Sequence, residues 1–279
     1  FVIDTRSRRS ALKQLAIKLF IFKKASLIFM VHSYNLKFYL SKKKWVGRYL
    51  YGSAKELIGV SEAIVDRFKR EYKIKKGVCI YNAFDESRIL KLSEEKVLLP
   101  EGTYILSYGR IVDTVKDYTF LVNAYAQSIL PGKNIKLYIL GDGPDKNKIQ
   151  NLVKELALED LVIFNGFTSN PFPYVKKACF TTLTSNYEGF SMVLIESLAL
   201  GVPVVSVDCK SGPSEVVVSG RNGILVPWKK KEDFILAMNK MVTNNSFYKG
   251  CRNGATSSVS KFKMDNIGRQ WQTILLQKK

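Results

Sequence analysis

Short apolar segments alternate with longer helical patterns through the second half of the chain, and this alternation limits the possible folds more than any other feature. Strands are predicted at six segments, residues 104–108, 136–140, 162–164, 180–183, 204–207 and 224–226. Helices are predicted between and after them, around residues 117–129, 144–157, 170–178, 191–200, 212–218 and 231–243. Strands that alternate with helices form a parallel sheet covered by those helices. The sequence therefore predicts a complete doubly wound, Rossmann-like α/β domain over residues 103–262.

The first 84 residues carry a shorter version of this pattern. Strands are predicted at residues 2–3, 27–31 and 78–81, with a helix at 10–22 and further helix from the second strand to about residue 70. A sheet this small leaves an edge and apolar surface uncovered. Residues 1–84 are therefore expected to be a partial amino-terminal domain, with residues missing before Phe1.

Two further segments connect or follow these domains. Residues 85–102 are charged and end in Pro100-Glu101-Gly102, so they are predicted to be the linker. Residues 263–279 are predicted to form a terminal helix that carries Trp271 and packs back on the amino-terminal domain.

The composition is that of a globular protein with a strongly basic surface. Hydrophobic residues make up 46% of the chain and charged residues 24%, and the net charge is +20. Basic proteins bind phosphate-bearing partners, although scattered lysines also serve solubility alone. Lysine clusters at residues 42–44 and 229–231 favour peripheral contact with an anionic membrane surface. Nucleic acid is not expected, because no stacking motif of an RNA-binding sheet is present.

The remaining bulk features predict a cytoplasmic protein, and the basic surface adds the expectation of peripheral contact at the inner face of the cell membrane. The four cysteines are far apart and suggest reduced thiols with no disulfide or metal site. No apolar run reaches the roughly 18–20 residues of a membrane span. In the helix at 10–22, Leu12, Leu15, Ala16 and Leu19 are expected to face the core, while Ile17 and Ile21 lie on the lysine-bearing face.

Glu196 is the residue that first indicates a ligand site. Its helix, residues 191–200, is apolar on almost every side and is therefore expected to be buried, with Ser191 as its N-cap. A buried carboxylate costs several kcal/mol unless a polar group meets it (about 2–7 for an uncompensated polar group). Glu188 lies eight residues earlier, with Gly189 beside it. Two acids thus frame the start of a buried helix, which is the geometry of a ligand site.

Other polar residues follow predicted strands, where doubly wound sheets collect ligands. Arg110 and Lys116 follow the strand at 104–108. They suit a diphosphate, because the planar guanidinium of Arg110 can donate two parallel hydrogen bonds and the ammonium of Lys116 acts as a point charge. Gly141, in the Gly-Asp-Gly-Pro turn after the next strand, can let backbone approach a ligand, although a tight turn explains the motif too. The backbone N–H groups of residues 189–191 form an anion site at a helix start.

Two candidates lie in the amino-terminal domain. His32 is the only histidine and follows the strand at 27–31, which places it at the presumed cleft, although a lone histidine is more often structural. Asn82 ends the strand at 78–81, where it is either a turn former or a ligand contact.

Together these motifs resemble a retaining glycosyltransferase of family 4, with the GT-B fold of two facing Rossmann-like domains. The resemblance runs from about residue 25 to 262, and the pair of glutamates separated by seven residues makes it specific. Its matching stretches are Gly59-Val60-Ser61-Glu62, Tyr81-Asn82, Gly109-Arg110 with Lys116, residues 141–144, Glu188-Gly189-Phe190 with Glu196, Gly201-Val202-Pro203-Val204 and Gly212-Pro213-Ser214-Glu215.

The resemblance implies a role for each matching residue on the donor side. Arg110 and Lys116 are similar to the pair that holds the donor diphosphate and steadies it as the leaving group. Glu196 is similar to the acid that receives the nucleotide ribose hydroxyls, and Glu188 to the acid that faces the donor sugar.

The resemblance assigns three further contacts. The N–H groups of Gly189, Phe190 and Ser191 would bind sugar hydroxyls and phosphate, and His32 is similar to the amino-domain histidine beside the donor sugar. The family needs no bound metal, and positive side chains with a helix terminus would stabilise developing charge instead. The co-substrate is then a nucleotide sugar, most often UDP- or GDP-linked.

The resemblance implies transfer of a sugar to a glycan or lipid-linked acceptor with retained configuration, in cell-surface polysaccharide biosynthesis. The family's glycine-rich amino-terminal loop near the acceptor has no match here, which leaves the activity of this chain by itself open. Two alternatives stay open as well: a GT-B nucleotide-sugar epimerase, and an inactive fragment or binding protein.

Overall fold

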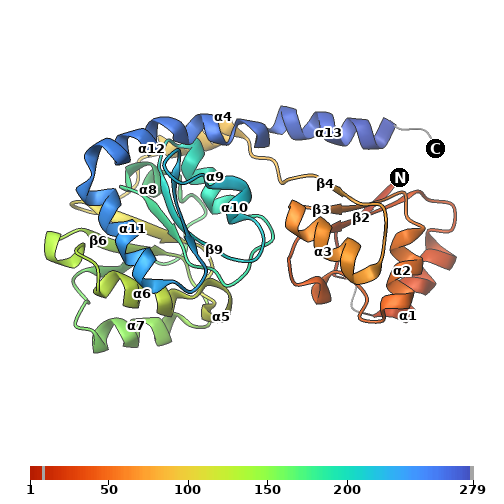
Figure 1. The fold of residues 1–279 in the computed structure, drawn as a ribbon, viewed down its shortest axis with the longest axis horizontal. Helices are drawn as coiled ribbons and strands as arrows, with labels where there is room; N and C mark the ends of the chain where they lie inside the picture. The colour runs from red at the N-terminus through yellow and green to blue at the C-terminus, as the bar shows by residue number, and fades with distance from the viewer. Residues whose placement is uncertain (8–9, 277–279) are drawn as a thin grey trace.

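The computed structural model describes residues 1–7 and 10–276 and contains two α/β domains, each built on a parallel sheet. Figure 1 shows the smaller amino-terminal domain beside the larger carboxy-terminal one, with two chain segments crossing between them. The two-domain α/β architecture predicted from the alternation of strands and helices is confirmed.

The amino-terminal sheet has the order β1-β2-β3-β4, and all its described pairings are parallel. Its strands are Val2–Asp4 (β1), Leu27–Val31 (β2), Glu56–Gly59 (β3) and Val78–Cys79 (β4). Its helices are Ala11–Ala16 (α1), a π-helical turn Ile17–Ile21, a 3₁₀ turn Leu36–Phe38, Lys44–Gly52 (α2) and Glu62–Tyr72 (α3). The continuous helix predicted up to residue 70 is wrong, because β3 lies between α2 and α3. The apolar part of β3 is too short for its periodicity to tell strand from helix.

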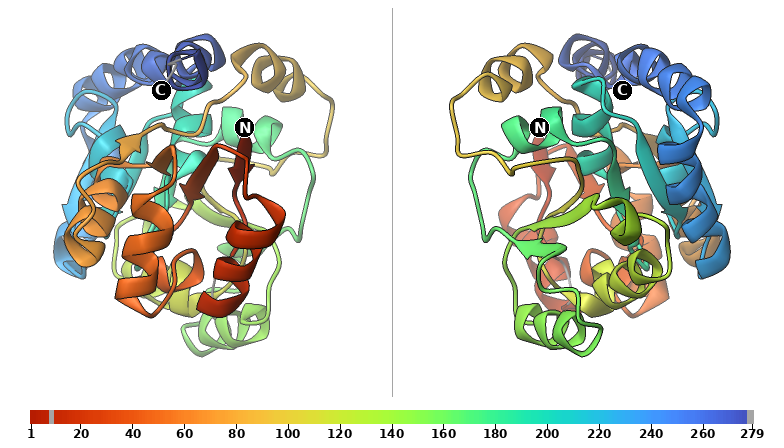
Figure 2. Two further views of the ribbon diagram at one scale, coloured as in Figure 1. Left: turned by 90° about the vertical axis from the view of Figure 1, so that its right-hand side faces the viewer. Right: turned by 90° about the vertical axis from the view of Figure 1, so that its left-hand side faces the viewer.

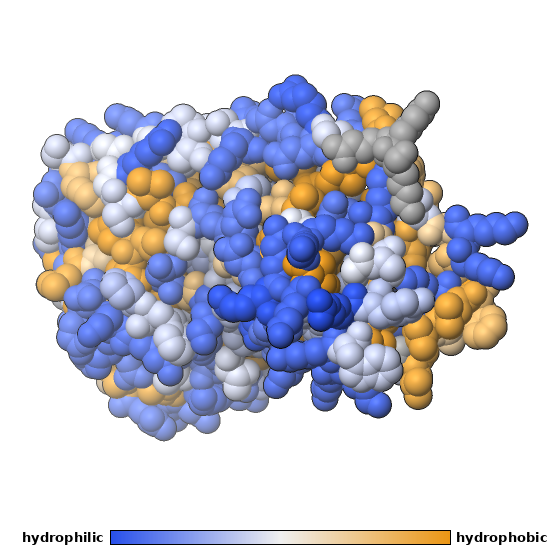
Figure 3. All heavy atoms as spheres, turned by 45° about the vertical axis from the view of Figure 1, so that its right-hand side comes forward, coloured by the Kyte–Doolittle hydropathy of each residue, from blue (hydrophilic) through white to orange (hydrophobic). Residues whose placement is uncertain are grey.

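The prediction for the core face of the first helix holds only in part, because Leu15 packs against the core and Ile21 is 68% exposed, as expected, but other residues differ. Leu12 is 78% exposed and Leu19 is 44% exposed, whereas Ile17 is half-buried. The helix changes from α to π at Ile17, and the wider π turn moves Leu19 off the expected stripe. Leu12 lies in the preceding α turn, so the π turn does not account for its exposure. Apolar side chains thus gather outside the core here, and Figure 3 shows apolar surface at the end of the molecule formed by this domain.

The carboxy-terminal sheet has the order β10-β9-β8-β5-β6-β7 and is parallel throughout. Its strands are Tyr104–Tyr108 (β5), Lys136–Leu140 (β6), Val162–Phe164 (β7), Thr181–Leu183 (β8), Val204–Asp208 (β9) and Gly223–Pro227 (β10). Its helices are Asp113–Lys116 (α5), Tyr118–Ala126 (α6), Lys146–Glu155 (α7), Phe172–Lys177 (α8), Met192–Ala199 (α9), Pro213–Val216 (α10), Lys231–Thr243 (α11) and Asn245–Ser258 (α12), with a 3₁₀ turn at Pro131–Lys133.

Both faces of this sheet are buried. Ile105 packs into one hydrophobic cluster, whereas its neighbours Tyr104 and Leu106 pack into another on the opposite side. Helices accordingly lie on both sides of the sheet in the right-hand view of Figure 2. Near-continuous apolar strands are typical of parallel sheets covered in this way.

Residues 85–102 contain more than a linker. They begin with helix Glu86–Ser93 (α4), which packs on α8 of the carboxy-terminal domain. Asn170 fixes this contact, because its side-chain amide donates to the carbonyl of Leu92 at 2.9 Å and to the carboxylate of Glu95 at 2.7 Å. The part of the connection without a helix or strand, residues 94–103, is therefore shorter than the charge pattern indicates.

The last helix, Met264–Leu276 (α13), begins where the chain crosses back between the domains. Phe84 and Lys263 form a β-bridge, and Lys263 pairs with Glu86. Beyond this crossing α13 extends above the amino-terminal domain in Figure 1, and Trp271 packs on the hydrophobic cluster that contains the amino-terminal sheet.

The domains also meet at the start of α3, through a contact that joins two of the recognised motifs. The N–H groups of Glu62 and Ala63 donate to the carboxylate of Glu215, at 2.9 and 3.3 Å. The hydroxyls of Ser61 and Ser211 lie 2.7 Å apart in the same interface. Glu215 of one domain thus supplies hydrogen-bond acceptors for the first turn of a helix in the other.

Replacing Glu215 with alanine is expected to lower the free energy of unfolding by about 1–2 kcal/mol. The variant leaves two helix N–H groups at the domain interface without their acceptor, as loss of a helix cap does. Urea denaturation of the variant and of Glu159→Ala, an exposed glutamate outside this interface, measures the difference. Equal stability of the two variants would show that the contact between the motifs does not hold the domains together.

Candidate functional site

The carboxy-terminal sheet has its topological switch point between β5 and β8. From β5 the chain adds β6 and β7 on one side, and then returns to add β8, β9 and β10 on the other. The loops after β5 and β8 therefore diverge and leave a crevice at their carboxyl ends, which is where open parallel sheets bind ligands. Arg110 and Lys116 follow β5, and Glu188 and Glu196 follow β8.

A cavity of about 460 Å³ lies at this crevice, within the range of ligand pockets. Arg110 and Gly141 line it from the loops after β5 and β6, and Glu196 lines it from α9. Phe167, which is 78% exposed, stands at its rim. Three of the residues predicted from the sequence thus share one cavity.

Glu196 is half-buried and meets a polar partner, as its place in an apolar helix requires. The hydroxyl of Tyr108 has two acceptors for its one hydrogen, the carbonyl of Val193 at 2.7 Å and the carboxylate of Glu196 at 3.2 Å. Burial raises the pKa of Glu196, and the hydrogen bond from Tyr108 offsets only part of that rise. Tyr108 was not predicted as part of the site, because a tyrosine at the end of a buried strand gives no sequence signal.

Gly141 brings two backbones together beside this cavity. A Cβ atom at Gly141 would lie 1.9 Å from the carbonyl oxygen of Gly109, and the φ of Gly141 is +154°. The loops after β5 and β6 are joined here by a hydrogen bond from the N–H of Gly109 to the carbonyl of Leu140, at 2.9 Å. The backbone that lies against Gly141 is therefore that of the neighbouring loop after β5.

Lys116 and Glu188 form an ion pair in the crevice. Lys116 Nζ lies 2.6 Å from Glu188 Oε1, and Ser185 Oγ also donates to Oε1 at 2.6 Å. The side chains are only 21% and 13% exposed, so the charges are largely removed from water and depend on each other. The two predicted residues, 72 positions apart in the sequence, are therefore direct neighbours.

A buried aspartate holds the segment that carries Lys116. Asp113 accepts hydrogen bonds from the N–H and hydroxyl of Thr119, at 2.8 and 2.6 Å, and from Lys148 at 2.6 Å. Burial would raise the pKa of Asp113, but the hydrogen bonds from Lys148 and Thr119 outweigh it and lower that pKa. These hydrogen bonds thus fix the short helix α5, whose last residue is Lys116.

Ser191 does not cap the start of α9 with its side chain, contrary to the prediction. Ser191 occupies the N-cap position without a side-chain hydrogen bond to the helix. Its hydroxyl is buried and has no hydrogen-bond partner within the described part of the chain. Phe190 turns its ring into a cluster with Tyr81 and Phe262, at 5.0 and 5.1 Å between centroids. The predicted anion contact at this helix start therefore stays a prediction.

Gly189 lies against the amino-terminal domain. A Cβ atom there would lie 1.9 Å from the carbonyl oxygen of His32, and the N–H of Tyr34 donates to the carbonyl of Glu188 at 3.2 Å. The segment after β2 thus reaches the crevice through its backbone. The His32 ring packs beside Tyr39, with 5.9 Å between the ring centroids, and neither His32 nor Asn82 lines the cavity at Glu196. Asn82 lies next to the crossing between the domains.

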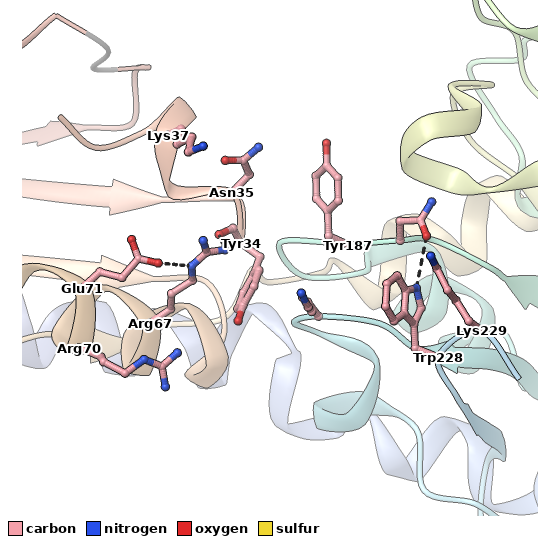
Figure 4. Close-up of a pocket in the computed structure, with 11 residues that line it drawn as sticks. Tyr34, Asn35, Lys37, Arg67, Arg70, Glu71, Tyr187, Trp228 and Lys229 are labelled. Atoms are coloured by element: carbon pink, nitrogen blue, oxygen red, sulfur yellow. Dashed lines mark hydrogen bonds and ion pairs between the residues drawn. The ribbon is translucent and has the colours of Figure 1, made fainter. Parts of the chain in front are cut away.

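A second cavity, of about 670 Å³, lies beside the loop that carries Tyr187 (Figure 4). Tyr34, Arg67 and Arg70 line it from the amino-terminal domain, and Tyr187 and Trp228 from the other domain. The sequence did not indicate it, because its parts lie in five separate segments. The lysine cluster beside Trp228 was its only signal.

Comparisons with known proteins agree with this architecture. Residues 90–258 match the family model described as glycosyl transferases group 1. The N-acetylgalactosamine-N,N'-diacetylbacillosaminyl-diphospho-undecaprenol 4-alpha-N-acetylgalactosaminyltransferase of Campylobacter jejuni is 32% identical over 253 residues, which are 90% of this chain and 67% of that protein. The lipopolysaccharide 1,6-galactosyltransferase of Salmonella typhimurium is 37% identical over 117 residues, 40% of this chain and 33% of that protein.

Solved structures share the fold. Anabaena HepE in complex with UDP and glucose has a TM-score of 0.80 at 21% identity, covering 96% of this chain and 76% of that one. S. aureus TarM has a TM-score of 0.76 at 20% identity, covering 91% of this chain and 51% of that one. The chain thus spans about two thirds of the Campylobacter protein and half of TarM. With its family model, its relatives and its two facing domains, the chain belongs to the glycosyl transferases group 1 family and has the GT-B fold.

Proposed function

We propose that this protein transfers a sugar from a nucleotide-sugar donor, with retained configuration, to an acceptor of the cell envelope. The observation that carries the proposal is the convergence of Arg110, Lys116, Glu188 and Glu196 at the switch point of the carboxy-terminal sheet, beside a cavity. Two acids and two cations at one crevice match the two kinds of group in a nucleotide sugar, its hydroxyls and its diphosphate.

The cavity lined by Glu196 receives the nucleoside. Glu196 accepts hydrogen bonds from the ribose hydroxyls, and the hydroxyl of Tyr108 holds its carboxylate in place. Arg110 reaches the diphosphate from the same cavity. UDP is the nucleotide we favour over GDP, because HepE shares the fold and was solved with UDP.

The sugar lies beyond the diphosphate, between Glu188 and the start of α9. Lys116 and the N–H groups of Gly189, Phe190 and Ser191 stabilise the diphosphate as its bond to the sugar breaks, without a metal ion. The buried Ser191 hydroxyl is available to the same group. His32, on the segment that touches Gly189, would face the sugar from the other domain.

A glycan or lipid-linked acceptor at the cytoplasmic membrane surface fits the rest of the molecule. The Campylobacter relative is named for a diphospho-undecaprenol substrate. Lysines accompany exposed apolar side chains in the amino-terminal domain, where Phe20 is 82% and Trp45 is 74% exposed. This combination suits peripheral contact with anionic lipid. Within the described residues no helix is both long and apolar enough to cross a membrane.

The test is transfer of labelled sugar. The protein is incubated with a panel of labelled UDP- and GDP-sugars and membrane lipid extract, and products are analysed by chromatography and proton NMR. We expect a labelled product whose new bond keeps the anomeric configuration of the donor. An inverted bond would contradict retention, and an epimerised sugar formed without acceptor would establish the epimerase alternative.

A further inference from the structure

The proposed donor site does not account for the charged side chains that line the second cavity. Five basic side chains line it, and its acidic side chain is Glu71. Arg67 pairs with Glu71 at 2.7 Å and donates to the carbonyl of Tyr34 at 2.6 Å. The charges of Arg67 and Glu71 are therefore paired with each other within the wall of the cavity. Among the described residues no carboxylate pairs with the other four, which are Lys37, Arg70, Lys210 and Lys229.

Cations gathered without acidic partners repel one another. The four side chains are exposed, so solvent screens the repulsion between them. Such a concave, one-sign lining attracts anions. Arg70 supplies a planar fork that binds carboxylate or phosphate through two hydrogen bonds.

Three aromatic rings also line the cavity, together with Asn35 and Asn186, and neighbouring side chains contact two of these rings. The indole N–H of Trp228 donates to Asn186 Oδ1 at 3.3 Å, and Lys229 Nζ lies 4.4 Å from the Trp228 ring. Arg67 stacks on Tyr34 at 4.3 Å. Figure 4 shows these rings on opposite sides of the cavity, with Tyr187 between them. Fixed rings give the apolar faces of sugar rings a surface to pack on at little entropic cost.

The cavity is also adjacent to the reacting end of the proposed donor site. Tyr187 lines it, and the next residue is Glu188. Tyr34 lines it from the opposite domain and donates its N–H to the carbonyl of Glu188. With its volume of about 670 Å³, the cavity suits a short oligosaccharide rather than a single phosphate.

We infer that this cavity binds an acidic oligosaccharide, whose sugar rings pack on Trp228 and Tyr187 and whose anionic groups pair with Arg70 and Lys210. Its role as the acceptor subsite rests on the proposed transferase function. The shared chemistry is a sugar chain that carries carboxylate or phosphate groups, which places the acceptor among acidic cell-envelope glycans.

Calorimetric titration of the purified protein tests this inference. The three sugar probes are tetragalacturonate, which carries carboxylates, mannotetraose phosphate, and the neutral maltotetraose. Oligouridylate is the nucleic-acid control, and all titrations are done at 0.15 M salt. We expect at least one acidic probe to bind about tenfold more tightly than the neutral one, and the tighter acidic probe identifies the anionic group. Equal binding of all three probes, or tighter binding of oligouridylate than of either acidic sugar, would overturn the inference.

Variants separate the cavity from general attraction to a basic protein. Arg70→Gln with Lys210→Gln is expected to weaken acidic-probe binding about tenfold, and Trp228→Ala is expected to weaken it as well. The matched control removes two exposed lysines outside the cavity, Lys154→Gln with Lys249→Gln, and should bind as the parent protein does. Equal losses in both double variants would also overturn the inference. Circular dichroism melting verifies that each variant is folded.

Titration with UDP on the same samples reports on the donor site separately. The double variants should bind UDP as the parent does. Loss of UDP binding in every sample, with acidic-sugar binding intact, would contradict the proposed function and leave the cavity a sugar-binding site.

Discussion

Replacing Gly189 with alanine is expected to lower sugar transfer by about 100-fold or more, while UDP binding changes little. The added methyl group would lie 1.9 Å from the carbonyl oxygen of His32, which belongs to the backbone of the other domain. Backbone cannot turn aside as a flexible side chain can, so the domains must separate at the reacting centre. A displacement of about 1 Å there is enough for a 100-fold loss of rate.

The measurement compares kcat for transfer with the dissociation constant of UDP. Gly268→Ala is the matched control, because a Cβ atom at Gly268 in α13 meets no atom within 4 Å. We expect this control to retain the rate of the parent protein. Normal transfer by Gly189→Ala would mean that the close approach of Gly189 to His32 is not part of the reacting state.

Replacing Glu196 with glutamine is expected to weaken UDP binding about 10- to 100-fold. The carboxylate can accept two ribose hydroxyls, and each hydrogen bond to a charged group contributes about 1.5–3 kcal/mol. Glutamine has the same shape and can still accept from the hydroxyl of Tyr108, so the fold should be retained. Calorimetry on this variant and on Glu155→Gln, an exposed glutamate of α7, measures the difference.

The same residue predicts a pH dependence. Burial raises the pKa of Glu196, so on acidification it takes up a proton at a higher pH than an ordinary glutamate does. The protonated group can accept fewer hydroxyl hydrogen bonds. UDP affinity should therefore fall as the pH decreases, starting above the usual glutamate range of about 4.3, and Glu196→Gln should remove this step. Unchanged affinity in Glu196→Gln would show that the ribose lies elsewhere.

The strands of the carboxy-terminal domain could be predicted closely from the sequence. β5, β6 and β7 have the predicted bounds, because each is an apolar run between turn residues and the sheet is buried on both faces. α12 was missed, because glycines and polar residues give it a low helix propensity. It forms because Cys251 and Ala255, one turn apart, are fully buried, and because Gly254 lets the carbonyl of Arg221 approach.

The candidate site was predictable to the extent that its residues follow strand ends. Arg110, Lys116, Glu188 and Glu196 could be placed at one crevice because carboxyl ends of parallel strands share an edge. No comparable rule predicts the contacts between the two domains. Glu215 meets α3 across 153 residues, and the wall of the second cavity comes from loops of both domains. Such pairings depend on how the domains face each other, which local sequence does not encode.

The central claim is that the switch point binds a nucleoside diphosphate through side chains and a helix terminus, without a metal ion. Calorimetric titration of UDP and of uridine in the presence of EDTA tests this claim most directly. We predict that UDP binds at least about tenfold more tightly than uridine, because Arg110 and Lys116 contact only the diphosphate. Equal affinities, or UDP binding that appears only when a divalent metal is added, would contradict the account.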